Sequence, residues 1–442
     1  MTVGKVEETA AAAQSSGTRR TVWSMTAVVI FLYVINYADK AVYGIIAQPL
    51  ARELGLTSAQ IGMVGSLFFL MFTIGGFTSG LLNRWFGLRW ALLVLALIWS
   101  ASVLPVVMSA TLAVLIASRM VLGIAEGPSS ALMHTAVYSW HAPDKRGFPS
   151  ALLLGSVSVA KIVFAPVLTY ITVSFGWRAA LITMAILGAI WCLLWLTTWS
   201  EGPHLAPTTE TATATEQHTG ATVPWLSIFR TPTFIFGALL FMGYYALQTV
   251  ILTWLPSYFE LGLGFSAQQA GSMFGIPSIF ALFYMLTISR VSDRMIARGS
   301  TVRRARAVVA ASGVALGAIV LLFVPYVESP LLVVAMISIA YGVASGAAPL
   351  LNTAVSVICP QRQLAGTLGV YMAIMAIGGL IAPWLAGVIV DRAATKADGF
   401  ALSFQIIGAA AGVFALLALL LMKPDRDRVR VLEATDKQAA SA

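Results

Sequence analysis

Long apolar runs separated by short polar segments account for most of the chain. Six runs lie at roughly 22–46, 60–82, 90–110, 112–139, 147–173 and 178–199, and six more at roughly 233–257, 268–289, 305–326, 331–358, 364–390 and 400–422. Each is close to the ~20 residues that an α-helix needs to cross a bilayer. The pattern predicts an all-α integral membrane protein with 12 transmembrane helices.

The order of the runs, six and then six more after a polar segment, indicates two pseudo-symmetric six-helix halves. Similar segments follow the second run of each half, "NRWFGLR" from Asn83 and "SDRMIARG" from Ser292. Many secondary transporters are built from such repeats, with the substrate site between the halves. The expected parts are a disordered tail over 1–20, an N-terminal bundle over 21–200, a linker over 201–230, a C-terminal bundle over 231–422 and a second tail over 423–442.

Basic residues predict the orientation of the helices. If both termini and the linker are cytoplasmic, the cytoplasmic segments contain 20 of the 27 Lys and Arg residues, and the opposite side contains four. Because Lys and Arg concentrate in cytoplasmic loops, we expect both termini in the cytoplasm.

The composition narrows the class of protein. With 59% hydrophobic and 10% charged residues, the chain has to use lipid as part of its solvent. The net charge of +9 is spread over short loops, which argues against nucleic acid as a partner. The sequence shows no phosphate-binding loop, metal-ligand spacing or Ser–His–acid arrangement, so we expect neither an enzyme nor a bound cofactor or metal. We expect a monomer surrounded by membrane lipid.

Five charged residues interrupt the apolar runs: Asp39, Lys40, Arg119, Glu126 and Lys161. Each costs roughly 2.5–3.5 kcal/mol at the centre of a bilayer, so they are expected to face one another, a water-filled cavity or a ligand. One interpretation is that they form ion pairs that only fasten the helices together. Fastening the helices does not require five buried charged residues, which favours a functional site.

The residue types and their spacing suggest what this site does. Arg119 and Glu126 are seven residues apart and share one helix face, and Pro128 is expected to kink that helix just beyond Glu126. Arg119 stays charged in any environment and its guanidinium matches a carboxylate. Buried carboxyl groups such as those of Asp39 and Glu126 can gain or lose protons near neutral pH. These are the groups needed to couple an anion to protons.

The same residues lie in motifs that resemble the anion:cation symporter family of organic-acid permeases, within the major facilitator superfamily. "NYADKA" resembles the family's NYxDR, "RMVLGIAEGP" its RxxxGxxEG, "SWHAPDKRG" its WFPxxERG and "TWLPSYF" its WLPxYF. The motifs occur in this order within residues 22–422. The resemblance implies a bacterial inner-membrane permease for a small organic anion, with the proton as coupling ion.

The resemblance also implies roles for individual residues. Asp39 and Glu126 would carry protons. Arg119 would organise the anion and the coupling, and Lys40 would supply a second positive charge. The side chains that would line the central cavity are Tyr37, Tyr244, Tyr245 and Gln248. Packing is the alternative role for the tyrosines.

Departures from the family pattern bear on the substrate. A Gln and an Asn that the family often carries near Val157 and Ala376 are absent, which makes a polyhydroxylated acid less suitable. Lys161 is additional, and the surplus of positive charge suits a dicarboxylate or a sulfonated carboxylate. The apolar stretch "YMAIMAIGGLIAP" from Tyr371 would also suit an aromatic acid. Aromatic and sugar acids are therefore the alternatives.

The loop after the second helix predicts a cytoplasmic gate. The family's gating motif has an Asp where this chain has Asn83, next to Arg84, whereas Asp293 and Arg294 are kept in the second half. Asn forms hydrogen bonds but has no charge, so the gate is expected to depend more on the second half.

We therefore predict a proton-coupled symporter that works by alternating access. A uniporter or exchanger is the alternative among transporters, and accumulation driven by a pH gradient would identify symport. Outside transport, the alternative is a membrane sensor that binds an acid without moving it. The short linker and tails argue against that role.

Overall fold

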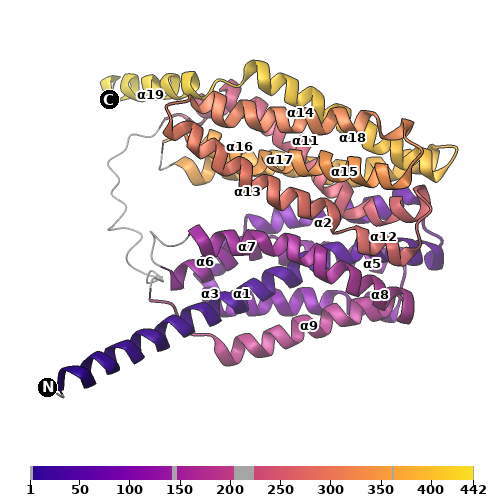
Figure 1. Cartoon of the computed structure of the whole chain (residues 1–442), viewed down its shortest axis with the longest axis horizontal. Helices are drawn as coiled ribbons and strands as arrows, with labels where there is room; N and C mark the ends of the chain where they lie inside the picture. Colours follow the sequence, from indigo (N-terminus) through magenta and orange to yellow (C-terminus); the bar gives the residue numbers. More distant parts are fainter. Residues whose placement is uncertain (1–2, 142–146, 204–222, 361–362, 442) are drawn as a thin grey trace.

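The structure, a computed structural model, describes residues 3–141, 147–203, 223–360 and 363–441. These residues form helices, turns and irregular segments and include no strand. Twelve of the described helical segments are long and apolar enough to span a membrane. The predicted all-α fold with 12 transmembrane helices in two halves is confirmed (Figure 1).

The N-terminal bundle contains the first six spanning segments. Its elements are α1 (Val3–Leu54), α2 (Ser58–Gly76), α3 (Ser79–Ser102), α4 (Leu104–Met108), α5 (Leu112–Glu126), α6 (Ser129–Trp140), α7 (Gly147–Val159), the π-helix η2 (Ala160–Phe164), α8 (Ala165–Phe175) and α9 (Trp177–Thr198). The predicted break after Glu126 is confirmed, because α5 ends there and α6 begins beyond Gly127 and Pro128.

The C-terminal bundle contains the other six. Its elements are α10 (Trp225–Phe229), α11 (Pro232–Ser257), the π-helix η3 (Tyr258–Gly262), α12 (Ala267–Met273), α13 (Ile276–Ala297), the π-helix η4 (Arg303–Val308), α14 (Val309–Leu322), the 3-10 helix η5 (Val324–Tyr326), α15 (Pro330–Ser345), α16 (Ala347–Ser356), α17 (Leu364–Arg392), α18 (Lys396–Leu421) and α19 (Pro424–Ser441).

Both ends of the chain lie on one side of the molecule, which we call the terminal end; the opposite side is the distal end (Figure 1). The disordered tail predicted over residues 1–20 stays a prediction. Residues 204–222 of the predicted linker and residues 142–146 of the "SWHAPDKRG" motif lie outside the described residues.

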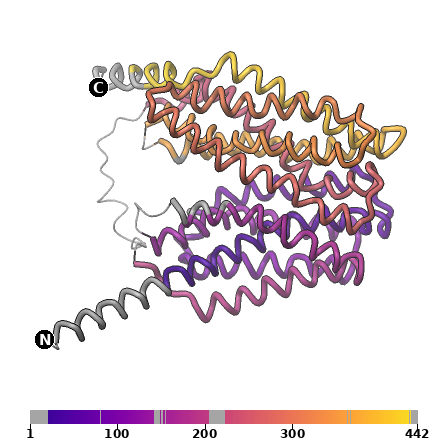
Figure 2. The backbone as a smooth tube through the Cα atoms, in the orientation of Figure 1, coloured from indigo at the N-terminus to yellow at the C-terminus, as the bar shows by residue number. Residues whose placement is uncertain are grey.

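The two bundles make close contact at the distal end. Figure 2 shows them as two bodies, indigo to magenta and orange to yellow, and α2 packs along α17 between them. A Cβ atom at Gly62 on α2 would collide with the Pro383 carbonyl oxygen, and one at Gly387 on α17 with that of Ser58. Small residues thus let the two backbones touch. This contact closes the distal side of the space between the bundles.

Candidate substrate and proton-coupling site

A buried ion pair joins α1 to α5. Lys40 Nζ lies 2.6 Å from Glu126 Oε2, and the two side chains are 5% and 0% exposed. The ammonium group also donates to Asn36 Oδ1 at 2.5 Å, one turn earlier on α1. The other carboxylate oxygen, Glu126 Oε1, has no hydrogen-bond partner among the described residues. Loss of either partner would leave a buried charge uncompensated.

The break between α5 and α6 holds Glu126 in this position. Ser129 Oγ, in the first turn of α6, donates to the Glu126 backbone carbonyl at 2.5 Å. Asn36 Nδ2 donates to the same Ser129 hydroxyl at 3.5 Å. Asn36 and Lys40 are four residues apart and therefore lie on one face of α1. The helix break and this polar face together bring α1, α5 and α6 to one point.

Asp39 and Arg119 belong to the same charged cluster. Asp39 is 3% exposed, and the charges of Glu126, Arg119 and Lys40 all act on its carboxyl group. The Arg119 guanidinium carbon lies 4.2 Å from the centroid of the Tyr43 ring. A narrow pocket of about 10 Å³, bordered by α1, α2, α5 and α11, reaches both Arg119 and Lys40. By this volume, the space beside Arg119 holds about one water molecule.

A larger cavity of about 540 Å³ lies between the bundles on the terminal side of Lys40. Gly76, where α2 ends, and Gly369, near the start of α17, both line it, and these positions are remote from the distal contacts of the same helices. Its polar lining side chains are Tyr37, Lys40, Thr73, Ser130, Tyr245, Gln248 and Thr249. Lys40 is the one charged side chain among the described lining residues.

The structure separates the predicted cavity residues into two groups. Tyr37, Tyr245 and Gln248 line the large cavity together with Lys40. Tyr244 is buried and is not among the described lining residues. Its ring stacks on that of Phe241 with 6.3 Å between centroids, and its side chain shares a hydrogen bond with Tyr341.

Lys161 also lies away from the described lining of this cavity. It sits in the π-helix η2, 2% exposed, and its Nζ is 5.4 Å from the centroid of the Tyr341 ring on α15. This contact crosses from the N-terminal to the C-terminal bundle. The sequence grouped Lys161 with the other cations because it also interrupts an apolar run, but position in a run alone does not reveal which surface a side chain faces.

The predicted gating residues lie at the terminal end. Asn83 and Arg84 precede Gly87, whose φ of 67° turns the chain after them. Asp293 Oδ1 is 3.9 Å from Arg306 Nη2, a contact within the C-terminal bundle, and Arg294 is exposed. Among the described residues, these four side chains make no ion pair or hydrogen bond between the bundles.

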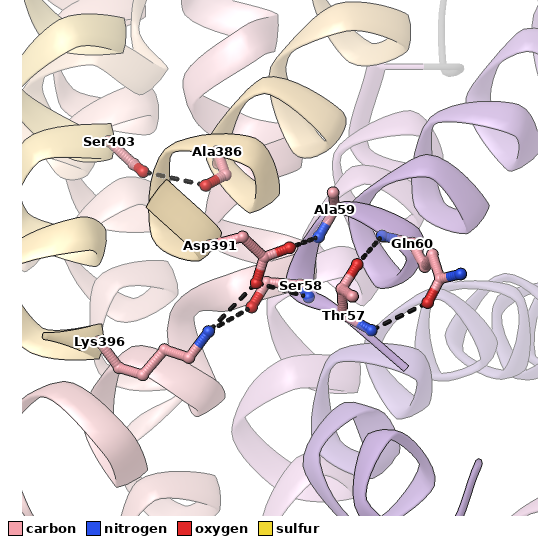
Figure 3. A network of polar contacts seen from close by, with 8 residues as sticks. All are labelled: Thr57, Ser58, Ala59, Gln60, Ala386, Asp391, Lys396 and Ser403. Atoms are coloured by element: carbon pink, nitrogen blue, oxygen red, sulfur yellow. Dashed lines mark hydrogen bonds and ion pairs between the residues drawn. The ribbon is translucent and has the colours of Figure 1, made fainter. Parts of the chain in front are cut away.

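A network of polar contacts between the bundles lies at the distal end instead, and the sequence did not predict it. Asp391 on α17 accepts hydrogen bonds from the backbone N–H groups of Ser58 and Ala59, at 3.0 and 2.6 Å, in the first turn of α2 (Figure 3). Lys396 Nζ lies 3.1 Å from both Asp391 Oδ1 and Ser58 Oγ. We call Asp391, Lys396 and the first turn of α2 the distal cap. The sequence signal for this contact is the position of Asp391, an acidic residue at the end of an apolar run.

A second distal contact joins the ends of α1 and η3. Arg52 Nη2 lies 2.6 Å from Glu260 Oε1, with side-chain exposures of 65% and 20%. Trp384 N also donates to Ser66 Oγ at 3.1 Å, between α17 and α2. The distal end therefore holds the bundles together by polar bonds as well as by backbone contact.

The chemistry available at the centre is ion binding and proton exchange. Two carboxyl groups and two cations lie beside one cavity, and the buried carboxyl groups can take up and release protons. The described residues contain no group of three His, Cys, Asp or Glu side chains that could hold a metal ion. An organic anion that enters the cavity meets the Lys40 ammonium group.

Comparisons with known proteins agree with this arrangement. The family model of the Major Facilitator Superfamily matches residues 29–363 and 305–441. The chain is 26% identical to the hexuronate transporter of Bacillus subtilis, covering 89% of this chain and 93% of that protein. It is 26% identical to a probable sulfoacetate transporter of Cupriavidus necator, covering 89% and 92%. A probable galactarate/D-glucarate transporter of Bacillus subtilis is 28% identical, covering 91% and 92%.

Solved structures share the fold. A D-xylose–proton symporter matches with a TM-score of 0.74 at 19% identity, covering 92% of this chain and 99% of that one. A bacterial homologue of the human lysosomal transporter Spinster, inward-facing and occupied, matches with a TM-score of 0.73 at 15% identity, covering 93% and 97%. With 12 spanning helices in two halves and a charged cluster beside a cavity between them, the chain belongs to the major facilitator superfamily, and it is a membrane transporter rather than an enzyme.

Proposed function

We propose that the protein imports a small organic anion, with a carboxylate as its anionic group, by proton symport through alternating access. The buried Lys40–Glu126 pair beside the cavity is the observation that supports this most directly. The names of the relatives refer to hexuronate, sulfoacetate and galactarate or D-glucarate, all of which are organic anions. We place the protein in a bacterial inner membrane, as a monomer.

The ion pair provides a direct link between proton binding and anion binding. The Glu126 carboxylate and a substrate carboxylate compete for the same Lys40 ammonium group. A proton on Glu126 removes its charge and frees Lys40 for the anion. An anion on Lys40 favours the protonated form of Glu126 to the same extent, because coupling free energies are reciprocal.

Asp39 and Arg119 extend this coupling. Asp39 is the second proton carrier, since its carboxyl group lies in the field of Glu126 and of both cations. Arg119 supplies a permanent positive charge that acts on both acids. It organises the anion and the coupling, and it borders the narrow pocket that also reaches Lys40. Tyr37, Tyr245 and Gln248 contact the substrate in the larger cavity.

The distribution of Lys and Arg supports a cytoplasmic position of the terminal end. The structure then corresponds to an inward-facing state, with the distal contacts closed towards the outside. In the outward-facing state, the distal cap separates, and Asn83, Arg84, Asp293 and Arg294 form the cytoplasmic gate. The anion and protons bind from the outside and are released into the cytoplasm.

Uptake into liposomes that contain the purified protein tests this function. A panel of labelled mono- and dicarboxylates, sulfonated, aromatic and sugar acids is offered with the outside acidic, with and without a protonophore. We expect one class to accumulate above its external concentration, and the protonophore to abolish that accumulation. Equilibration without accumulation would contradict symport and identify a uniporter.

A further inference from the structure

The walls of the large cavity suggest which anion it takes. We propose that the substrate is a monocarboxylate with an apolar body about the size of an aromatic ring, rather than a polyhydroxylated acid or a dicarboxylate. This inference rests on the proposed function, because it names the substrate class of the same site. The charges, the apolar walls and the free polar groups of the cavity support it separately.

The charges in reach of the cavity allow one carboxylate. Lys40 is the one charged side chain among the described lining residues. Arg119 is not among the described lining residues of this cavity. It borders a separate pocket of about 10 Å³, which has no room for a second carboxylate. Lys161 faces the Tyr341 ring at the bundle interface. A ligand in this cavity therefore does not meet all three cations at once. This removes the argument for a dicarboxylate.

The walls of the cavity are mostly apolar. Phe69, Phe72 and Phe77 line it from the N-terminal bundle. Phe241 and the methionines Met372 and Met375 line it from the C-terminal bundle. Aromatic and Met side chains pack well against rings, and Met adapts to irregular shapes. The volume of about 540 Å³ lies within the 300–1,000 Å³ that is typical of small-molecule sites.

Few polar groups in the lining are free for substrate hydroxyls. Thr73 and Thr249 donate their hydroxyl protons to the Phe69 and Ala246 carbonyls of their own helices, at 2.9 and 3.0 Å. The Ser130 hydroxyl is 3.3 Å from the Tyr33 hydroxyl. The Tyr37 side chain shares a hydrogen bond with Tyr33. Apart from Lys40, that leaves the side chains of two described lining residues, both from α11.

These two residues are Tyr245 and Gln248, which make no side-chain hydrogen bond within the described residues. They can bind one or two polar groups of a ligand, such as a ring hydroxyl. A sugar acid would bring several hydroxyl groups into contact with Phe and Met side chains. Burial of a hydroxyl without a partner is unfavourable, and a hydrophobic pocket typically discriminates against an added hydroxyl by up to about 100-fold.

Calorimetric titration of the purified full-length protein tests the inference. The probes are 3-phenylpropionate, galactonate, succinate and sulfoacetate. We expect 3-phenylpropionate to bind at least tenfold more tightly than each of the other three. The tightest probe is then offered to liposomes with an acidic exterior, and protein-free liposomes correct for passive entry of the uncharged acid.

A matched pair of variants locates the binding. Met375→Gln adds a polar group to the cavity wall and should reduce the preference for 3-phenylpropionate over galactonate at least threefold. Met336→Gln makes the same change on α15, outside the described lining, and should leave the ratio unchanged. An unchanged ratio in Met375→Gln would show that this cavity does not select the substrate.

The other outcomes separate the two proposals. If galactonate or succinate binds more tightly and is accumulated in a protonophore-sensitive way, the substrate class is wrong while proton symport stands. If no probe binds and none of the panel is accumulated, both proposals fail.

Discussion

The two bundles share one helical plan but differ in what they bury. Every buried Asp, Glu, Lys or Arg side chain of the described membrane-spanning helices belongs to the N-terminal bundle: Asp39, Lys40, Arg119, Glu126 and Lys161. At the same depth, the C-terminal bundle presents Tyr245, Gln248 and methionines to the cavity. The difference suggests that the N-terminal bundle carries the anionic group and the protons, and that the C-terminal bundle recognises the body of the substrate.

Arg119→Lys should have a large effect on transport, because Arg119 belongs to the charged cluster of the N-terminal bundle. A lysine keeps the charge but loses the guanidinium fork and its stacking on Tyr43. With about 1.5–3 kcal/mol for a charged hydrogen bond, proton-driven uptake should fall about 10- to 100-fold. Initial rates in liposomes measure this. Arg298→Lys, an exposed change at the terminal end, is the control and should transport like the parent. An active Arg119→Lys would remove Arg119 from the mechanism.

Lys40→Met tests whether the Lys40–Glu126 ion pair has a structural or a functional role. The single change leaves Glu126 buried without its cation, which typically costs about 3–5 kcal/mol of stability. The double variant Lys40→Met/Glu126→Gln removes both charges and should recover most of the thermal stability, measured by melting in detergent. It should still not accumulate substrate. Accumulation by a stable double variant would show that the pair only fastens the helices.

Tyr245→Phe should have a smaller effect and of a different kind. It removes one free hydroxyl from the C-terminal wall of the cavity. Loss of a neutral hydrogen bond of about 0.5–1.5 kcal/mol should raise KM about two- to tenfold. The accumulation ratio at a given pH gradient should not change. Tyr170→Phe, at an exposed position of α8, is the control. A lower accumulation ratio in Tyr245→Phe would contradict the division between the bundles.

Asp391→Asn should have the smallest effect, because it alters a contact between the bundles and leaves the buried residues of both bundles unchanged. The variant can still accept a hydrogen bond from α2 but loses the charge at the start of that helix. Such a charge contributes about 0.3–1 kcal/mol, so the population with a closed distal end should fall about two- to fivefold relative to the open one. Distances between spin labels across the distal end measure this. An unchanged population would show that backbone contact alone closes this end.

The fold could be predicted from the sequence because each spanning helix has to be apolar over its whole length. The break after Glu126 was also predictable, since Gly127 and Pro128 are local signals.

The charged cluster was predictable in membership but not in arrangement. An ionisable side chain in an apolar run is conspicuous, so Asp39, Lys40, Arg119 and Glu126 were identified together. Which acid pairs with Lys40 depends on how α1 and α5 pack against each other. Helix packing also determines that Lys161 faces the C-terminal bundle. The distal cap joins Asp391 to residues more than 300 positions earlier, and no local pattern reports such a contact.

Asp39→Asn provides the most direct test of the central claim that buried acids of the N-terminal bundle couple the anion to protons. Two measurements are made on the same liposomes: uptake driven by a pH gradient, and exchange of labelled for unlabelled substrate without a gradient. The account predicts that the variant keeps exchange and accumulates less substrate than the parent chain, because the anion still binds Lys40 while one of the two proton carriers is gone. Accumulation equal to that of the parent chain, with exchange intact, would contradict the claim.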